Sequence, residues 1–155
     1  MTGVLGFAGI TGPDPDGWIT WTTEDPALYN AQVLGPLRVR VEGSQIRVRM
    51  AVRPLHANVN GAIHGGATLG LIDVALFAIL RASGASVAVA TVTLDLSTQF
   101  LAPGRVDRPL DVVGEVLRET GRLAFIRGVA EQVDDDGTVI RTAAFQGTLR
   151  KGSNA

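Results

Sequence analysis

The feature that most constrains this chain is a long stretch, residues 66–82, that is apolar on nearly every side and contains one carboxylate, Asp73. A helix without a polar face has to be covered all round by other parts of the folded protein. Asp73 lies two turns inside the predicted helix, too far from its start to cap it or to gain from its dipole. Burial of a carboxylate is costly unless it is paired or used. Because Gly70, one turn earlier, has no side chain to cover the carboxyl group, we expect Asp73 to face a cleft.

The residues that lead into this helix, His64-Gly65-Gly66, include none of the usual capping side chains. We therefore expect the first N–H groups of the helix to be free. Free N–H groups at a helix start can bind an oxygen that gains negative charge, and glycine lets the ligand approach closely. This pattern suits acyl transfer. The alternative is that Asn58 or Asn60 folds back as a cap.

The spacing between these two features indicates how they would work together. Gly65 and Asp73 are eight residues apart, which separates their backbones by roughly 12 Å along a helix. One helix therefore cannot present both groups to one carbonyl carbon. If both act on one substrate, the N–H group comes from one subunit and the carboxylate from another, as two antiparallel helices in a two-fold dimer would arrange.

The composition excludes several classes of protein. A length of 155 residues with 46% hydrophobic residues suits one domain with a core. The net charge of −1 provides no field that would attract nucleic acid or a membrane surface. The absence of cysteine excludes disulfides, cysteine nucleophiles and thiolate metal sites. Since the N-terminus lacks the basic region of a signal peptide, we expect a cytoplasmic protein.

Residues 61–80 could also be interpreted as a membrane span. An aspartate at the centre of a span costs about 2.5 to 3.5 kcal/mol on an insertion scale. The alternating segments that follow in the sequence also need a helix to cover them. We therefore favour a core helix and expect no membrane partner.

The segments before the long helix are expected to form an arm, a short helix and a hairpin. Residues 1–24 predict an irregular arm with one short strand. Asp25-Pro26 opens a short helix that Gly35-Pro36 closes, and the apolar residues expected to pack it on the sheet are Leu28, Val33 and Leu34. Residues 37–41 and 46–52 alternate strictly and predict a hairpin.

Four arginines share the outer face of this hairpin. They could bind the phosphates of a nucleotide-bearing ligand, or they could form a solvated face that resists edge pairing. We favour the second interpretation. The residues are Arg38, Arg40, Arg47 and Arg49.

Alternating segments follow the long helix to the end of the chain. Residues 86–100 predict a strand with one apolar face, which includes Val92 and Leu94, and one polar face, which includes Thr93 and Asp95. Further strands are expected at about 109–118, 122–133 and 138–149, joined by glycine-containing turns. One helix set between a hairpin and a run of antiparallel strands predicts an α+β fold with a curved sheet folded around the helix.

A family resemblance is carried by the run Asn58-Val59-Asn60-Gly61-Ala62-Ile63-His64-Gly65-Gly66, with Asp73 beyond it. This pattern resembles the signature of hotdog-fold acyl-CoA thioesterases, most closely the phenylacetate-pathway (PaaI-like) branch of the 4-hydroxybenzoyl-CoA thioesterase superfamily. The likeness covers about residues 25–150 and leaves out the arm, residues 1–24, and a tail, residues 151–155. It implies an acyl-CoA thioesterase that acts on an aryl- or fatty-acyl-CoA, needs no cofactor and assembles as a homodimer or homotetramer.

The resemblance also implies roles for individual residues. The N–H group of Gly65 would polarise the thioester carbonyl, and Asn58 would help to hold that carbonyl or the attacking water. Asp73 of the partner subunit would be the general base or the nucleophile, and Thr93 would orient the water. His64 would shape the loop rather than do chemistry. The residues expected to contact the substrate are His64, Gly66, Asn60 and Gly70.

Each assignment has a simpler alternative. Asp73 could be a structural carboxylate at a dimer seam, Thr93 could be an ordinary strand threonine, and Asn58 and Asn60 compete for one role. His56 and His64 with Asp73 lack a further clustered ligand, so no metal site is expected.

Three other functions were compared with thioester hydrolysis. A serine esterase of the α/β-hydrolase class is excluded because the chain is short and has no G-x-S-x-G motif. A hotdog dehydratase needs a histidine base, and His64 at the helix mouth is poorly placed for it. A non-catalytic acyl-CoA binding or sensor protein of the same fold remains the main alternative.

Overall fold

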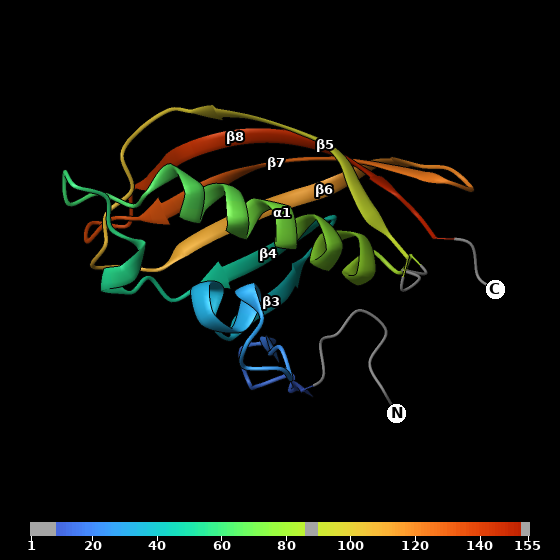
Figure 1. The fold of residues 1–155 in the computed structure, drawn as a ribbon, viewed down its shortest axis with the longest axis horizontal. Helices are drawn as coiled ribbons and strands as arrows, with labels where there is room; N and C mark the ends of the chain where they lie inside the picture. The colour runs from blue at the N-terminus through green and yellow to red at the C-terminus, as the bar shows by residue number, and fades with distance from the viewer. Residues whose placement is uncertain (1–8, 86–89, 153–155) are drawn as a thin grey trace.

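The computed structural model describes residues 9–85 and 90–152. One eight-stranded antiparallel sheet curves around a single long helix, α1 (Gly65–Ala82), as Figure 1 shows. The strand order is β1-β2-β3-β4-β6-β7-β8-β5. The strands are β1 (Ile10–Thr11), β2 (Ile19–Trp21), β3 (Leu37–Glu42), β4 (Gln45–Met50), β5 (Val92–Phe100), β6 (Leu110–Glu119), β7 (Leu123–Val133) and β8 (Val139–Arg150). The α+β layout predicted from the sequence is confirmed.

The regular strands form where the sequence alternates most strictly. β3 and β4 pair as the expected hairpin about a turn with Gly43 at positive φ. β6, β7 and β8 pair in succession, and Gly137 occupies the turn between the last two, also at positive φ. Successive residues of a strand point to opposite faces of the sheet, so the apolar residues of the alternating pattern face α1 and the residues between them face outward.

Helix α1 packs closely on the sheet because small residues lie beneath it. A side chain on Gly114 of β6 would be 2.7 Å from Ile79, and one on Gly147 of β8 would be 2.7 Å from Leu76. Both apolar side chains are fully buried in the core. α1 is long and apolar enough to cross a membrane by length and composition, but 56% of it is buried in the fold, as expected of a core helix.

One expectation about α1 is corrected by the structure. The helix is not covered on every side, because one stripe of it is exposed or only partly buried. The spacing of three and four residues puts the members of this stripe on a single helix face. The exposed stripe consists of Gly66, Leu69, Gly70, Asp73, Phe77 and Arg81.

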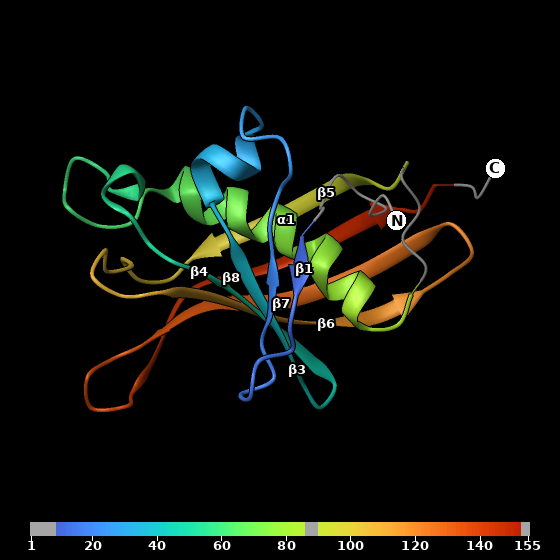
Figure 2. The same cartoon turned by 90° about the horizontal axis from the view of Figure 1, so that it is seen from below.

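The N-terminal arm is more regular than predicted. It contributes two short strands, β1 and β2, where one was expected, and β2 pairs with β3 so that the arm extends the main sheet. Figure 2 shows both strands in front of α1 on the β3 side. Trp21 of β2 joins the core, which explains why the arm stays with the domain. Residues 1–8 of the predicted arm, and residues 153–155 of the predicted tail, lie outside the described residues.

The short helix expected after Asp25-Pro26 begins later than predicted and has a different geometry. η1 (Asn30–Leu34) is a π-helical turn, in which Gly35 N–H donates to the carbonyl of Asn30. Leu34 is buried and Val33 packs against the core, as expected, whereas Leu28 is exposed. In Figures 1 and 2, η1 lies beside the first half of α1.

Strand β5 departs from its predicted alternation. Its register with β8 shifts between Thr93 and Asp95, so that Thr93 and Leu96 both pair with buried positions of β8, and Leu94 lies outside the ladder. A bulge of this kind adds one residue and exchanges the two faces of a strand beyond it. β5 is also an edge of the sheet, with exposed Leu94 and Phe100. Residues 86–89 of the predicted strand lie outside the described residues.

The four arginines of the outer face are paired with carboxylates. Arg47 contacts Asp111 at 2.9 Å and Glu131 at 3.0 Å, and both acids are buried. The hydrogen bond from Arg47 lowers the pKa of Glu42 below its usual value. Trp18 stacks on three of the guanidinium groups, those of Arg38, Arg40 and Arg49. This pairing argues against phosphate binding. The expected solvated face that resists edge pairing is corrected as well, because β3 and β4 are inner strands of the sheet and all four arginines are partly buried.

Candidate active site

The start of α1 is capped by His64, which is not one of the usual capping residues. His64 has an extended backbone, and its Nδ1 accepts a hydrogen bond of 2.8 Å from Gly66 N–H. The amide of Gly66 is therefore occupied, which corrects the expectation that it is free. An imidazole nitrogen substitutes here for the side-chain oxygen that usually satisfies an N2 or N3 amide.

The amide N–H of Gly65 is available as a hydrogen-bond donor. Within residues 9–85 and 90–152, Gly65 N–H makes no hydrogen bond, while the next amides of the helix bond to His64 Nδ1 and His64 O. Phe100 is the nearest side chain, and its Cζ would be 3.3 Å from a Cβ placed on Gly65. The geometry thus leaves one free donor at the positive end of α1, beside an aromatic ring.

Asn58 holds the loop that precedes the helix. Its Oδ1 accepts from Asn60 N–H at 2.9 Å and from Ala62 N–H at 3.1 Å. Neither Asn58 nor Asn60 caps the helix, so that alternative is wrong. The Asn58 side-chain NH2 makes no hydrogen bond within the described part of the chain and remains able to donate. The side chain of Asn60 is exposed, and only its backbone N–H takes part in the loop.

The loop is fixed at its other side by the segment before β6. Ile63 N–H donates to the carbonyl of Gly104 at 2.8 Å, and Ala62 forms a bridge with Arg105. A Cβ on Gly104 would be 2.9 Å from Ile63, so this crossing needs glycine. The direction of the Gly65 amide is therefore determined by contacts on both sides of the loop.

Asp73 and Thr93 lie together in one chain. Thr93 Oγ1 donates a 2.8 Å hydrogen bond to Asp73 Oδ1, and both residues are partly buried. The bulge in β5 makes this possible, because it places Thr93 on the side of the strand that faces α1. A hydrogen bond to a carboxylate fixes its orientation and leaves its second oxygen for another partner.

The predicted site residues thus form two groups within one protomer. The first, at the start of α1, contains Asn58, Asn60, His64, Gly65 and Gly66. The second, two turns along the helix, contains Gly70, Asp73 and Thr93. The helix rise separates the Gly65 and Asp73 backbones by roughly 12 Å, so the structure does not bring the two groups together in one chain.

The space beside Gly70 is occupied, contrary to expectation. A Cβ on Gly70 would be 2.3 Å from the hydroxyl oxygen of Tyr29, which fills the notch that the glycine leaves on α1. Tyr29 was not identified from the sequence, and no local signal could have identified it, because it is 41 positions from Gly70. Leu76, on the sheet-facing side of α1, is fully buried and lines no accessible surface.

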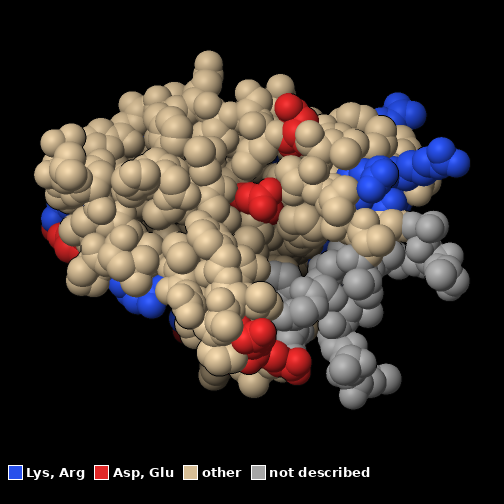
Figure 3. Space-filling model, in the orientation of Figure 1, with Lys and Arg blue, Asp and Glu red and all other residues tan. Residues whose placement is uncertain are grey.

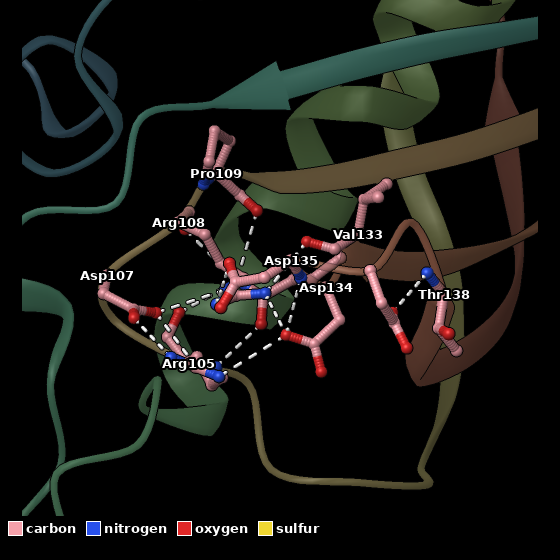
Figure 4. A network of polar contacts seen from close by, with 10 residues as sticks. Arg105, Asp107, Arg108, Pro109, Val133, Asp134, Asp135 and Thr138 are labelled. Atoms are coloured by element: carbon pink, nitrogen blue, oxygen red, sulfur yellow. Dashed lines mark hydrogen bonds and ion pairs between the residues drawn. The ribbon is translucent and has the colours of Figure 1, made fainter.

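A charged network lies next to the loop, as Figure 4 shows. Arg108 contacts Asp134 and, at 3.1 Å, Asp135, and Arg105 contacts Asp107. The hydrogen bond from Arg105 lowers the pKa of Asp107 to about 2. Since both arginines already have carboxylate partners, this network stabilises the end of the sheet and does not present free cations to a ligand.

Two cavities lined by described residues do not include Asp73. One, of about 640 Å³, is on the outer face of the sheet between β5 and β6 and includes Arg127 and Arg141. The other, of about 180 Å³, lies between the arm and the last turns of α1 and includes Trp21 and Ala78. The described residues contain no group of three His, Asp or Glu side chains that could hold a metal.

Comparison with known proteins identifies the family. The model of the thioesterase superfamily matches residues 60–139, just over half of the chain. A comparison with curated proteins finds no match.

Several solved structures share the fold. The E. coli PaaI protein from the phenylacetic acid degradation operon is 20% identical, with a TM-score of 0.63, over 82% of this chain and 86% of that one. The conserved protein PA5202 from Pseudomonas aeruginosa is 23% identical, with a TM-score of 0.64, over 81% and 94%. A hypothetical thioesterase from Streptococcus pneumoniae TIGR4, solved with coenzyme A, is 18% identical, with a TM-score of 0.63, over 78% and 89%.

Identities in this range establish a common architecture rather than a common substrate. The family match covers residues 60–66 of the Asn58–Gly66 run, the whole of α1 and strands β5, β6 and β7. The fold and the family implied by the sequence resemblance are therefore confirmed. The chain belongs to the thioesterase superfamily and has the hotdog fold.

Proposed function

We propose that this protein hydrolyses an acyl-CoA thioester to the free acid and CoA, at a site completed by two copies of the chain. The observation that carries the proposal is the free N–H of Gly65 at the start of α1, together with the Thr93-bound carboxylate of Asp73 on the exposed stripe of the same helix. Family membership supports the reaction class, and the coenzyme A bound in the Streptococcus pneumoniae neighbour supports the carrier.

The chemistry follows from these groups. The thioester carbonyl oxygen accepts from Gly65 N–H, which stabilises the negative charge that develops when the carbonyl carbon is attacked. Asp73 either takes a proton from the attacking water or attacks directly to form an anhydride that water then opens. The carbon–sulfur bond breaks, the thiolate leaves, and it takes up a proton. Thr93 keeps one carboxylate oxygen occupied so that the other faces the reaction.

A dimer would bring the two groups together. Two copies of α1 that run antiparallel across a two-fold axis would place the start of one helix beside the middle of the other. Apart from Gly70, which Tyr29 covers, the exposed stripe of α1 is available for this contact, and so is edge strand β5. Figure 3 supports this, because the face that carries α1 in Figure 1 is largely free of charged side chains.

Asp73→Asn tests the proposal. Asparagine keeps the size of the side chain and can accept from Thr93, but it is neither a general base nor a carboxylate nucleophile. We expect thiol release from a panel of aryl- and fatty-acyl-CoA substrates to fall by at least about a hundredfold, with no change in oligomeric state. Asp95→Asn, an exposed aspartate on β5, is the matched control and should keep full activity. Undiminished hydrolysis by Asp73→Asn would refute the assignment.

The same assay separates an enzyme from a binding protein. A non-catalytic acyl-CoA sensor would raise its Tm in the presence of acyl-CoA, because the ligand binds only the folded state. It would release no thiol with any member of the panel. An enzyme should show both the rise in Tm and the release of thiol.

A further inference from the structure

One aromatic residue outside the predicted site lies against Gly70, one helical turn before Asp73. The hydroxyl oxygen of Tyr29 would be 2.3 Å from a Cβ on Gly70, and ring atoms Cζ and Cε1 would be 3.2 and 3.4 Å away. Gly70 has an ordinary helical backbone, so glycine is needed here for space and not for conformation. Any larger residue at this position would push the tyrosine off the helix.

Tyr29 covers one position, Gly70, of the exposed stripe of α1 that also carries Asp73. Gly70 precedes Asp73 by three residues, so both lie on one face of the helix. Side chains of a helix lean toward its N-terminus, and the carboxylate of Asp73 therefore leans toward the turn that Tyr29 covers. Thr93 reaches Asp73 from β5, whereas Tyr29 approaches from the segment before η1. The carboxylate thus accepts a hydrogen bond from a strand hydroxyl, and an aromatic ring covers the helix position one turn before it.

The backbone that carries Tyr29 is held firmly. Tyr29 directly precedes η1, whose carbonyl at Val33 accepts from Arg53 Nη2 and from His56 Nε2, each at 2.6 Å. His56 is 1% exposed, and its Nδ1 accepts from Arg53 N–H, so the ring proton is on Nε2. The His56 carbonyl in turn accepts from His64 N–H at 2.7 Å. One network therefore fixes both the Tyr29 segment and the loop of Gly65.

The side chain of Tyr29, in contrast, is open to a ligand. It is 53% exposed, and its hydroxyl makes no hydrogen bond with residues 9–85 or 90–152. Exposed Leu69 is on the same stripe, one residue before Gly70. An open aromatic ring on a fixed backbone, one helical turn from the Asp73 carboxylate, is a surface on which part of a substrate can lie.

We propose that Tyr29 is a specificity-determining residue of the acyl site. Its ring forms a wall against which a flat aryl group packs, and Gly70 lets that ring lie close to α1. This inference rests on the proposed function and names the substrate class for the same site. An aryl group gains a favourable ring contact with Tyr29. A long alkyl chain that follows α1 from Asp73 toward Gly70 meets the ring that fills the notch.

The test compares two acyl groups on the same carrier. Values of kcat/KM are measured for benzoyl-CoA and decanoyl-CoA with the native protein, Tyr29→Ala and Gly70→Ala. We expect the preference for benzoyl over decanoyl to fall about five- to tenfold in Tyr29→Ala. Gly70→Ala should shift it in the same direction, because the new methyl group displaces the ring, and alanine keeps the helix stable. Leu28→Ala, a similarly exposed neighbour, should leave the preference unchanged.

Two further measurements make the result decisive. Tyr29→Phe should retain the preference, because it keeps the ring and removes only the hydroxyl. If the benzoyl to decanoyl ratio stays the same in Tyr29→Ala, the inference is wrong, even if both rates fall. If Tyr29→Ala loses kcat/KM equally for both acyl-CoA substrates but not for the corresponding N-acetylcysteamine thioesters, Tyr29 contacts the CoA portion instead of the acyl group.

A binding experiment separates this inference from the proposed function. Dissociation constants of S-phenacyl-CoA and S-decyl-CoA, whose thioether bonds are not hydrolysed, are measured by calorimetry. If the native protein turns over no acyl-CoA but Tyr29→Ala loses its preference for S-phenacyl-CoA, the proposed hydrolysis fails and the specificity role stands. If the ratio of the two constants is the same in both proteins, the specificity role fails whatever the activity.

Discussion

Gly65→Pro would remove one hydrogen-bond donor from the proposed site and leave the rest of the fold nearly unchanged. Proline has no N–H group, and it is well tolerated at the first position of a helix. Gly65 occupies that position in α1. The residue before proline has to be extended, and His64 already is, with φ −64° and ψ 135°. Because Gly65 N–H has no partner within the described residues, the substitution breaks no hydrogen bond of the fold.

The expected loss follows from the role of that donor. Removal of one donor to an oxyanion costs about a hundred- to a thousandfold in kcat, or ~2.7–4 kcal/mol. The added proline side chain contributes little to this loss. A Cβ at position 65 would be 3.3 Å from the exposed ring of Phe100, which can move aside. Gly65→Ala makes the same contact and keeps the N–H group, so it is the matched control.

The assay is steady-state thiol release, with Tm measured in parallel. We expect Gly65→Pro to keep its Tm within a few degrees and to lose kcat by the factor above, while Gly65→Ala stays within a few-fold of the native rate. Equal rates in Gly65→Pro and Gly65→Ala would refute the oxyanion role of this amide.

Mixing two inactive variants tests whether the site is shared. In a dimer of Gly65→Pro with Asp73→Asn, one site has a native Gly65 and a native Asp73, and the other has neither. Random exchange of subunits in an equal mixture makes about half of the dimers mixed, so about a quarter of the native activity should return. If both groups acted within one protomer, mixing would restore nothing.

Three further predictions concern Thr93, strand β5 and acid stability. Thr93→Val removes the hydrogen bond to Asp73 and should lower kcat about tenfold, whereas Thr93→Ser should retain the rate. Leu94→Lys places a charge on the exposed edge of β5, so gel filtration should find an inactive monomer, and an active monomer would contradict the shared site. Asp107 and Glu42 have lowered pKa values in the folded protein. Their contribution to stability is complete above about pH 4.5 and is lost as the pH falls toward 2, so Tm should drop across this range and drop less in Asp107→Asn.

The sequence predicted the elements whose hydrophobic period is long and regular. The α1 helix, the β3–β4 hairpin and strands β6 to β8 were placed within a few residues, because each contains several repeats of its own period. The contact between Asp73 and Thr93 was not predicted, although the family resemblance singled out both residues. Periodicity alone would have put Thr93 on a polar outer face.

The features that were missed depend on contacts between distant segments. A bulge in β5 cannot be read from alternation, because the sequence does not state which residue is left out of the ladder. The π-helical turn η1 is held by Arg53 and His56, which follow it by about twenty residues. The cap by His64 depends on the loop that orients its ring. Tyr29 and Gly70 are likewise joined only by the fold.

The two borders of the sheet differ in a way that limits how large an assembly can become. On one side the sheet finishes with β1, a strand of two residues, and on the other with β5, a strand of nine. A short border offers few backbone groups to a neighbour, while the long one can pair with its own copy. Such a pairing would use the long edge of both molecules. Within the described residues it would leave only the two-residue β1 edges, which are too short to extend the sheet into a fibre.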